Sequence, residues 1–372
     1  MKKTVAVVYG GASPEHEISI ITGVTALNAL PSCYKAVPLY LKGGKFYSGK
    51  SLFDIRQYSQ FSEKSAAECA VIGDRIYIKK RRGKLVPFDK IDVALLATHG
   101  GEGENGSLAG FFEINNIPYT QGSPYSAAVT LDKEATKIIA EKCGVKVVEW
   151  LSFCETKTGE YFNEAESKLG YPLVVKPNDQ GSSIGVTLVK THCELKDAAE
   201  LALQLSQKLI IERAIPSPVE LNIAVMRNGG DFLVSEPERP LLAKEILSFK
   251  DKYEGGTIIG GADKVREFPA NVSEEVAVLI KETALKMYKF LDLNGVVRFD
   301  YLLENGGLSE ETLYLNEINS IPGSLSRYLF PQLSNAEFYE ILINNAGTQP
   351  KFKPFESGVL KNIVGAKCCR KR

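Results

Sequence analysis

The chain has 372 residues, of which 44% are hydrophobic and 24% are charged, and these proportions are ordinary for a soluble protein with a full core. Lys and Arg together number 45, as do Asp and Glu, so the zero net charge argues against a general nucleic-acid binder. At about 100 to 200 residues per domain, the length predicts two or three domains.

The cysteines and the apolar runs indicate the compartment. The seven cysteines are scattered and include no CxxC pair, which favours the reducing cytoplasm. The apolar run at the start of the chain is too short for the core of a signal peptide. No stretch approaches the roughly eighteen apolar residues that a membrane span needs. We therefore expect a cytoplasmic protein.

The first part of the chain predicts an open α/β sheet. Residues 4–11 (TVAVVYGG) are a β-rich run ended by two glycines, and residues 18–30 (ISIITGVTALNAL) follow as a helix. Strand, glycine turn and helix open a sheet whose ligands gather at the strand ends. Residues 44–90 are rich in Ser and Lys with weak periodicity, and are expected to be an excursion from the sheet. Further predicted elements are strands at 34–41 and 92–101, a helix at 107–116, a strand at 117–122 and a domain boundary near Ser123.

The remaining elements alternate between helices and short strands. Residues 131–150 read as a helix closed by Gly144 and then a strand, and residues 171–189 as two strands joined by a glycine-serine loop. Other predicted elements are a buried strand at 208–215, antiparallel strands at 219–226 and 231–240, a helix at 273–293 capped by Asn271 or Ser273, and a poorly ordered basic tail from Gln349.

The loop in KPNDQGSSIGV has the composition of a phosphate-binding loop. Lys176 ends the strand before it, its glycines free the backbone and its serines add hydroxyl donors. A glycine-serine hairpin without a ligand is the alternative. The sequence has no GxxxxGKS motif, which excludes a Walker-type nucleotide site.

Two strand-like segments carry paired polar residues. Glu317 and Asn319 stand two apart in LNEINS, and Arg298 and Asp300 stand two apart in VVRFDYLL. Residues i and i+2 of a strand project from the same face, so neighbouring strands would gather three oxygen ligands beside a guanidinium. Such ligands hold Mg²⁺ together with substrate phosphates. The alternatives are solvated carboxylates on an edge strand and a structural ion pair between Arg298 and Asp300.

Five motifs in order resemble those of the D-alanine–D-alanine ligase family of the ATP-grasp superfamily. They are GGASPEHEISIITG, THGGEGENGSLAGFFE, LDKEATK, VVKPNDQGSSIG, and RFDYLL with LNEINSIPG, between Lys3 and about Ala346. The resemblance implies an ATP-grasp architecture of mixed α/β and α+β class. The implied parts are an amino-terminal Rossmann-like substrate domain (1–123), two grasp subdomains enclosing the nucleotide (124–216 and 217–346), and a basic tail (347–372).

The resemblance also implies the reaction. One D-alanine carboxylate attacks the γ-phosphate of ATP to give an acyl phosphate and ADP, and the amine of a second D-alanine displaces phosphate. The product, D-alanyl-D-alanine, serves peptidoglycan synthesis and so cell-wall biogenesis and cell shape. The family further implies Mg²⁺ or Mn²⁺, as two ions, and a homodimer formed through the amino-terminal region.

The family's site residues transfer to this sequence by motif. The implied catalytic residues are Glu15, Ser182, Tyr253, Arg298 and Gly323, and the implied substrate-binding residues are His99, Ser326, Tyr328 and Leu329. The implied metal ligands are Asp300, Glu317 and Asn319. The residues implied to bind ATP are Lys133, Lys176, Ser183, Ile184, Gly185, Glu212, Arg213, Ile215, Glu220 and Lys252. Without the family, an isolated lysine is more often solvated surface and a loop tyrosine a half-buried anchor. The alternative for Glu15 is a helix cap or a surface charge.

One departure bears on the second substrate. The family usually has a serine five residues after the glycine of PG, which grips the carboxylate of the second amino acid, whereas this chain has Tyr328 there, with Arg327 before it. We expect Ser326 or Arg327 to help hold that carboxylate. D-lactate-using relatives lack Tyr253, so its presence favours an amino-acid acceptor. The alternatives are a ligase with a different second substrate, such as D-serine, and a non-catalytic nucleotide-binding relative.

Overall fold

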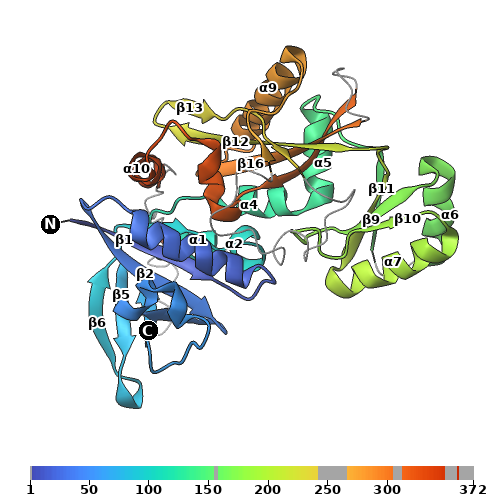
Figure 1. The fold of residues 1–372 in the computed structure, drawn as a ribbon. Coiled ribbons are helices and arrows are strands. Elements are labelled where there is room, and N and C mark those ends of the chain that lie inside the picture. Colours follow the sequence, from blue (N-terminus) through green and yellow to red (C-terminus); the bar gives the residue numbers. More distant parts are fainter. Residues whose placement is uncertain (1, 155–157, 242–265, 305–311, 348–357, 360–372) are drawn as a thin grey trace, which may run out of the picture.

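The computed structural model describes most of the chain as three main sheets and one two-stranded pair, with their covering helices (Figure 1). Lys252, Tyr253 and nearly all of the tail from Gln349 lie outside the described residues, so the predictions made for them are not addressed. The described residues are 2–154, 158–241, 266–304, 312–347 and 358–359.

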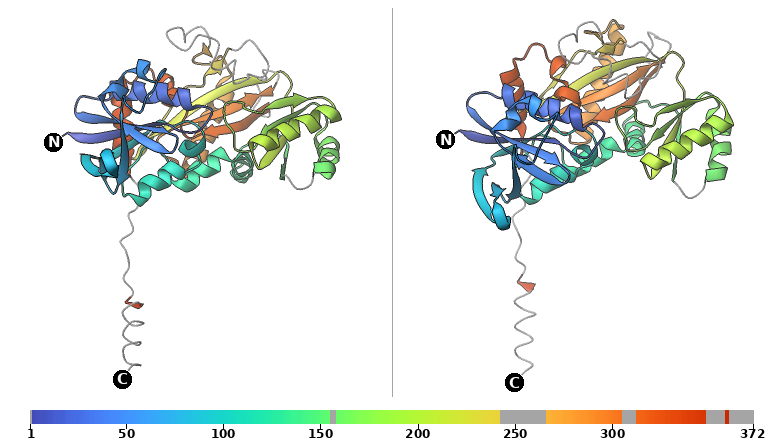
Figure 2. Two further views of the ribbon diagram at one scale, coloured as in Figure 1. Left: turned by 90° about the horizontal axis from the view of Figure 1, so that it is seen from below. Right: turned by 60° about the horizontal axis from the view of Figure 1, so that its bottom comes forward.

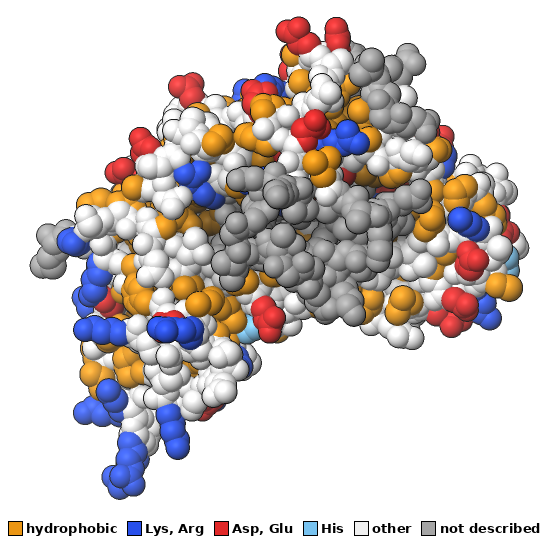
Figure 3. Space-filling view, viewed as in Figure 1, with side chains coloured by type: hydrophobic (Ala, Val, Ile, Leu, Met, Phe, Trp, Pro, Cys, Tyr) orange, Lys and Arg blue, Asp and Glu red, His pale blue; other side chains and the backbone are white. Residues whose placement is uncertain are grey.

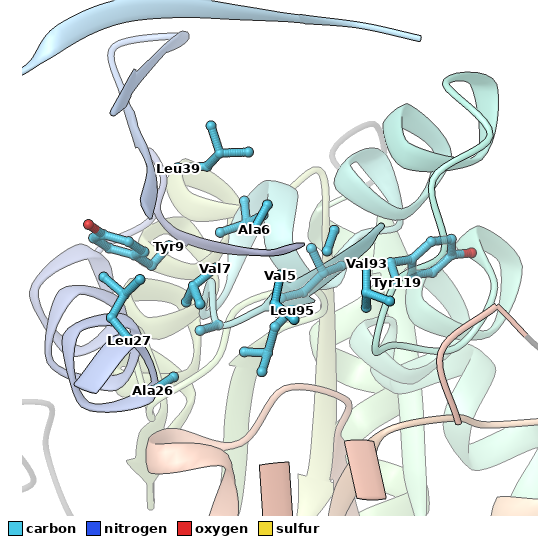
Figure 4. Close-up of a cluster of buried hydrophobic side chains, with 14 of the residues drawn as sticks. Val5, Ala6, Val7, Tyr9, Ala26, Leu27, Leu39, Val93, Leu95 and Tyr119 are labelled. Carbon is cyan, nitrogen blue, oxygen red and sulfur yellow. The ribbon is translucent and has the colours of Figure 1, made fainter. Parts of the chain in front are cut away.

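The first sheet has seven strands in the order β6-β5-β4-β3-β2-β1-β7. β1 pairs in parallel with both β2 and β7, as expected for an open α/β sheet. The side chains of β1 are buried from Thr4 onward, and α1 covers one face of the strand; Figure 4 shows Leu27 of that helix beside Tyr9. The bounds are β1 (Lys3–Gly10), α1 (His16–Ala29), β2 (Tyr34–Lys42) and β7 (Val93–Leu96).

The expectation that residues 44–90 form an excursion from the sheet is wrong. They add four antiparallel strands to its β2 edge. These strands are short and partly solvated, which explains their polar composition and the weak periodicity. Basic side chains gather at this end of the sheet (Figure 3, lower left). The strands are β3 (Lys45–Ser48), β4 (Ala67–Ile72), β5 (Arg75–Lys79) and β6 (Leu85–Lys90).

Short helices follow β7 and lead to the second sheet. The predicted strand at 117–122 is only a bridge, in which Tyr119 pairs with Ala94. Ser123 caps the next helix by accepting a hydrogen bond from the Ser126 N–H. These helices are α2 (Gly101–Glu104), α3 (Ser107–Ile114), α4 (Pro124–Leu131) and α5 (Lys133–Lys142).

The second sheet has the strand order β10-β9-β11-β8 and is antiparallel. The predicted hairpin at 171–189 is present as β9 and β10, whereas the strand expected after Gly144 begins only at Trp150. Two helices that the sequence reading did not identify, α6 and α7, pack on this sheet (Figure 1). The bounds are β8 (Trp150–Cys154), α6 (Thr158–Leu169), β9 (Leu173–Pro177), β10 (Thr187–Val189), α7 (His192–Leu205) and β11 (Lys208–Arg213).

The third sheet, β13-β12-β16-β17, is also antiparallel. Ser273, one of the two predicted caps, accepts a hydrogen bond from the Val276 N–H at the start of α9. A small pair, β14 (Arg239–Pro240) with β15 (Arg266–Glu267), lies beside β12. The other bounds are β12 (Val219–Asn228), β13 (Asp231–Val234), α9 (Glu274–Phe290), β16 (Val296–Leu303), β17 (Leu313–Asn319) and α10 (Asn335–Asn345).

One face of the third sheet shares a hydrophobic core with the first sheet, and its other face, under α9, has a core of its own. Met226 of β12 and Phe338 of α10 belong to the same buried cluster as Val5 of β1. The second sheet has a separate core, and it stands apart as its own lobe in both views of Figure 2. The domain limits near residues 123, 216 and 346 remain a prediction.

Candidate active site

The paired strands β16 and β17 place the predicted metal ligands side by side. Asp300 lies opposite Glu317, and Arg298 lies opposite Asn319. Directly opposed residues of an antiparallel pair share a face of the sheet. Two carboxylates and a carboxamide therefore converge beside a guanidinium, as the spacing in the sequence predicts.

Asp300 is held in an ion pair by Arg298. The guanidinium donates to both carboxylate oxygens, from Nε at 2.6 Å and from Nη2 at 2.7 Å. The Asn319 amide donates a third hydrogen bond to Asp300 Oδ2 at 2.9 Å. The ion pair between Arg298 and Asp300, which the sequence offered as an alternative to a metal site, is thus present, and it involves one of the proposed metal ligands.

The donor set fits a hard divalent ion in its chemistry. Among the described residues, no group of three or more His, Cys, Asp or Glu side chains is arranged to hold a metal. The proposed donors are two carboxylates, Asp300 and Glu317, and one carboxamide, Asn319. Mg²⁺ sites of this kind use one or two carboxylates and complete the shell with water and substrate phosphates.

Three buried lysines gather beside these strands. Lys176 Nζ donates to Glu212 Oε2 at 2.6 Å and to Asn316 Oδ1 at 2.9 Å. Lys137 Nζ lies 3.0 Å from the other oxygen of Glu212. Burial alone would raise the pKa of Glu212, but the two ammonium groups outweigh it and lower this pKa to about 2. Lys133, the third lysine, donates to the Gln180 carbonyl oxygen at 2.5 Å.

A β-bulge in the third sheet supplies one of these contacts. Asp300 pairs with Glu317, whereas Tyr301 pairs with Leu315, so Asn316 is the extra residue of β17. Bulges redirect side chains. Here the redirected Asn316 side chain reaches Lys176 on the second sheet. Neither Lys137 nor Asn316 was recognised as a site residue in the sequence, because their partners are distant along the chain.

The glycine-serine loop reaches the amino-terminal domain through Glu15. The Ser182 hydroxyl donates to Glu15 Oε1, across 167 positions of sequence. Ser182 and Ser183 both have positive φ, at 52° and 57°. Gly100 packs against the same carboxylate: a Cβ there would lie 2.8 Å from Glu15 Oε2 and displace it, and the φ of +63° favours glycine.

His99 is buried and uses both ring nitrogens within the protein. Nδ1 donates to the Ile321 carbonyl at 2.7 Å, so Nε2 accepts from the Thr22 hydroxyl at 2.8 Å. Burial lowers the pKa of His99 to about 4, which keeps the ring neutral. The structure thus uses His99 to tie α1 to the segment after β17.

Glu104 is a further buried acid that the sequence reading missed among the glutamates of GEGENG. Burial, and then the charge of Glu15, raise the pKa of Glu104 to about 8. Glu104 lines a pocket together with residues that come from α4, α5, the glycine-serine loop and β17. The pocket is lined by Glu104, Thr130, Leu131, Lys133, Thr136, Gln180, Gly181, Asn316, Glu317, Ile318 and Asn319.

Residues 323–329, here called the acceptor segment, form a tight turn. The Tyr328 hydroxyl donates to Glu238 Oε2 at 3.2 Å, and the Arg266 guanidinium lies 4.3 Å from the centre of the Tyr328 ring. Arg327 donates to the Phe330 carbonyl at 2.8 Å, so this guanidinium is engaged locally.

Two further predicted residues of the acceptor segment, Ser326 and Leu329, are both buried. Ser326 is fully buried, and its hydroxyl has no hydrogen-bond partner among the described residues. A buried hydroxyl without a partner costs free energy, which singles out Ser326 within this turn. Leu329, by contrast, is part of the core shared by the first and third sheets.

The predicted adenine-binding residues lie at the end of β11. The Glu212 carboxylate is contacted by Lys176 and Lys137, and its role at the adenine edge stays a prediction. The backbone N–H of Arg213 donates to the Glu149 carbonyl oxygen and that of Ala214 to the Pro172 carbonyl oxygen, both at 3.0 Å. Glu220 lies on β12 of the third sheet, the next strand along the chain, and contributes to the negative potential at Arg298. Ile215 follows directly after these engaged backbone groups.

Comparison with known proteins gives a consistent result. Two family models match, D-ala D-ala ligase N-terminus over residues 4–123 and D-ala D-ala ligase C-terminus over residues 139–344. A D-alanine–D-alanine ligase of Thermosipho africanus is 35% identical over 353 residues, which cover 91% of each chain.

Solved structures agree on the fold. The D-alanine–D-alanine ligase of Helicobacter pylori has a TM-score of 0.74 at 26% identity, covering 94% of this chain and 100% of its own. The D-Ala:D-Ser ligase VanG of Enterococcus faecalis has a TM-score of 0.76 at 24% identity, covering 92% of this chain and 99% of its own, and at that identity shows the fold alone.

Proposed function

The chain belongs to the D-alanine–D-alanine ligase family, with its ATP-grasp fold, and we propose that it joins two D-alanines at the expense of ATP to give D-alanyl-D-alanine, ADP and phosphate. The reaction proceeds through an acyl phosphate of the first D-alanine. The amine of the second D-alanine then displaces phosphate. The product would serve peptidoglycan synthesis.

One observation supports this proposal most directly. Glu317, which is opposed to Asp300, lines the same pocket as Lys133, and burial lowers the pKa of Lys133 while the charge of Glu317 partly offsets that effect. Anionic ligands for a metal and a cation for phosphate thus stand side by side. Phosphoryl transfer needs this combination. The transferred phosphoryl group carries negative charge on its oxygens, and a metal ion and a cationic side chain together stabilise that charge.

Asp300, Glu317 and Asn319 would hold Mg²⁺, and the ion would neutralise charge on the β- and γ-phosphates. Lys133 and Lys176 would hold the α- and β-phosphates, with Ser183 to Gly185 closing over them. Lys252, outside the described residues, would reach the γ-phosphate by family resemblance.

Other residues of this chain would handle the amino acids. Glu15 would pair with the ammonium of the first D-alanine, and Ser182 keeps that carboxylate in place. Tyr253, outside the described residues, would complete a trio with them by family resemblance. Arg298 and the Gly323 N–H would stabilise the oxyanion of the tetrahedral intermediate.

The second amino acid would bind against the acceptor segment. The Tyr328 hydroxyl is engaged by Glu238, so Ser326 becomes the better candidate to donate to the substrate carboxylate. His99 would act indirectly, by holding α1 against the Ile321 carbonyl. D-serine remains an alternative acceptor because the family's usual serine is replaced by Tyr328.

The test is incubation of the purified protein with ATP, D-alanine and either Mg²⁺ or Mn²⁺. Phosphate release and the product mass are measured together, with L-alanine as the matched negative control. A panel of D-serine, other D-amino acids and D-hydroxy acids identifies the acceptor. ATP binding without any dipeptide from any member of the panel would favour the non-catalytic alternative and overturn this proposal.

Three finer expectations belong with it. Mg²⁺ is proposed as the working ion, the cytoplasm as the compartment, and a homodimer formed through the amino-terminal region as the assembly. None of the described helices is long and apolar enough to cross a bilayer. Sedimentation velocity across a range of protein concentrations tests the assembly.

A further inference from the structure

The contacts of Lys176 suggest that two further residues adjust it for its ligand. Its ammonium is shared between a carboxylate, Glu212, and a neutral carboxamide oxygen, Asn316. Only 9% of the Lys176 side chain and 3% of the Glu212 side chain are exposed. A one-to-one buried ion pair would largely cancel the charge that a phosphate is meant to meet.

Lys137 changes that balance. Its side chain is only 1% exposed, and its ammonium lies 3.0 Å from Glu212 Oε1. Two ammonium groups therefore share one carboxylate, which leaves one positive charge uncompensated within this group of three. The Lys137 ammonium meets one oxygen of a carboxylate that also pairs with Lys176, so it has only a share of that negative charge. A buried cation with such poor compensation is costly unless an anion arrives.

Asn316 fixes the position of Lys176 without adding negative charge. It belongs to the third sheet, whereas Lys176 ends β9 of the second sheet, and 140 positions of sequence separate them. Its place in the bulge beside Glu317 means that Lys176 is held at a set position relative to the metal strand. A carboxylate at this position would instead bind the ammonium tightly and compete with phosphate.

We propose that Lys137 and Asn316 are positioning residues for Lys176. Lys137 compensates the negative charge of Glu212, so that the positive charge of Lys176 remains available to the α- and β-phosphates of ATP. Asn316 fixes the position of the Lys176 ammonium. The inference rests on the proposed function, since it assumes that the ligand is a nucleotide polyphosphate. Lys137 and Asn316 would act through Lys176 and not by direct contact with the metal ion or the nucleotide.

The experiment measures nucleotide binding by titration calorimetry without any amino acid present, so that no turnover occurs. The ligands are ADP and adenosine, which differ by the two phosphates. Lys137→Met should weaken ADP binding about tenfold or more and leave adenosine binding unchanged, because only the phosphates meet Lys176. Lys137→Arg, which retains the charge, should restore part of the loss. The matched control is Lys142→Met, on the same helix but exposed.

Asn316→Asp and Asn316→Leu provide an independent test on the other side of Lys176. The aspartate should weaken ADP binding more than the leucine, because it adds the competing charge, and adenosine should again be unaffected. Equal loss of ADP and adenosine binding, or no loss of either in folded variants, would overturn the proposal. If Lys137→Met fails to fold, the proposal is decided by whether Asn316→Asp loses more ADP affinity than Asn316→Leu. Failure of the ligase assignment is seen separately, as wild-type protein that binds ADP but forms no dipeptide.

Discussion

The Ser182 hydroxyl donates a hydrogen bond to the Glu15 carboxylate and so connects the glycine-serine loop of the second sheet to the start of α1. Glu15 precedes the first turn of that helix, and Gly100 and Gly181 pack closely against its carboxylate. The loop that would cover the phosphates and the residue that would hold the first D-alanine are therefore mechanically connected. Binding at one is expected to favour closure at the other.

Ser182→Ala should lower kcat/KM for the first D-alanine with little change in thermal stability. A hydrogen bond to a charged group contributes about 1.5–3 kcal/mol, so a loss of roughly tenfold to a hundredfold is expected. Steady-state kinetics with ATP saturating measures it. Ser167→Ala, an exposed serine on α6, is the control. Wild-type kinetics in Ser182→Ala would show that the contact has no part in catalysis.

Glu317→Gln should fold normally and lose nearly all metal-dependent ADP formation. The amide keeps the shape of the side chain but removes the negative charge opposite Asp300, which weakens the hold on a divalent ion. Turnover over a series of Mg²⁺ concentrations is measured beside the melting temperature. Glu282→Gln, exposed on α9, is the matched control. A folded Glu317→Gln variant with unchanged Mg²⁺ dependence would contradict the metal assignment.

Ser326→Ala should raise the KM of the second D-alanine and leave the KM of ATP unchanged. The buried Ser326 hydroxyl has no partner in the described structure, so its removal costs the protein little by itself. Ser324→Ala is the control, because Ser324 lies in the same turn but is exposed. Tyr328→Phe, compared in the same assay, tests whether the contact with Glu238 shapes the subsite.

His99 should make the protein less stable in acid. Its pKa of about 4 in the folded state lies below the usual value near 6.5, so between these values the unfolded chain binds the proton and the folded chain does not. Stability therefore falls as the pH is lowered from about 6.5 toward 4, by roughly 3 kcal/mol at most.

Comparison with His99→Gln isolates this effect. Glu104 titrates in the opposite sense, because its raised pKa costs stability as the pH rises, and taking the difference between two proteins removes that shared contribution. Urea unfolding at pH 7 and pH 4.5 should show a larger acid-induced loss in the wild type than in His99→Gln. The exposed His192→Gln should behave like the wild type. An identical loss in His99→Gln would refute the assignment.

The sequence by itself determined the class of the fold and the residues that face one another locally. The alternation of a β-strand sends Arg298 and Asp300, or Glu317 and Asn319, to one face wherever the strand lies, because i and i+2 always project together. In the same way, the glycines and serines after Lys176 indicate a phosphate-binding loop. Such features depend on covalent geometry and near neighbours, so they can be read without knowing the packing.

The tertiary structure decided which distant segments meet and in what register. The bulge that directs Asn316 to Lys176, the pairing of Lys137 with Glu212, and the contact of Tyr328 with Glu238 all join residues whose own neighbours give no sign of the partner. Residues 44–90 extend the first sheet for the same reason, since strand pairing there depends on an available edge at β2. Local patterns set the direction of each side chain, whereas burial against a particular partner is fixed only when the whole chain packs.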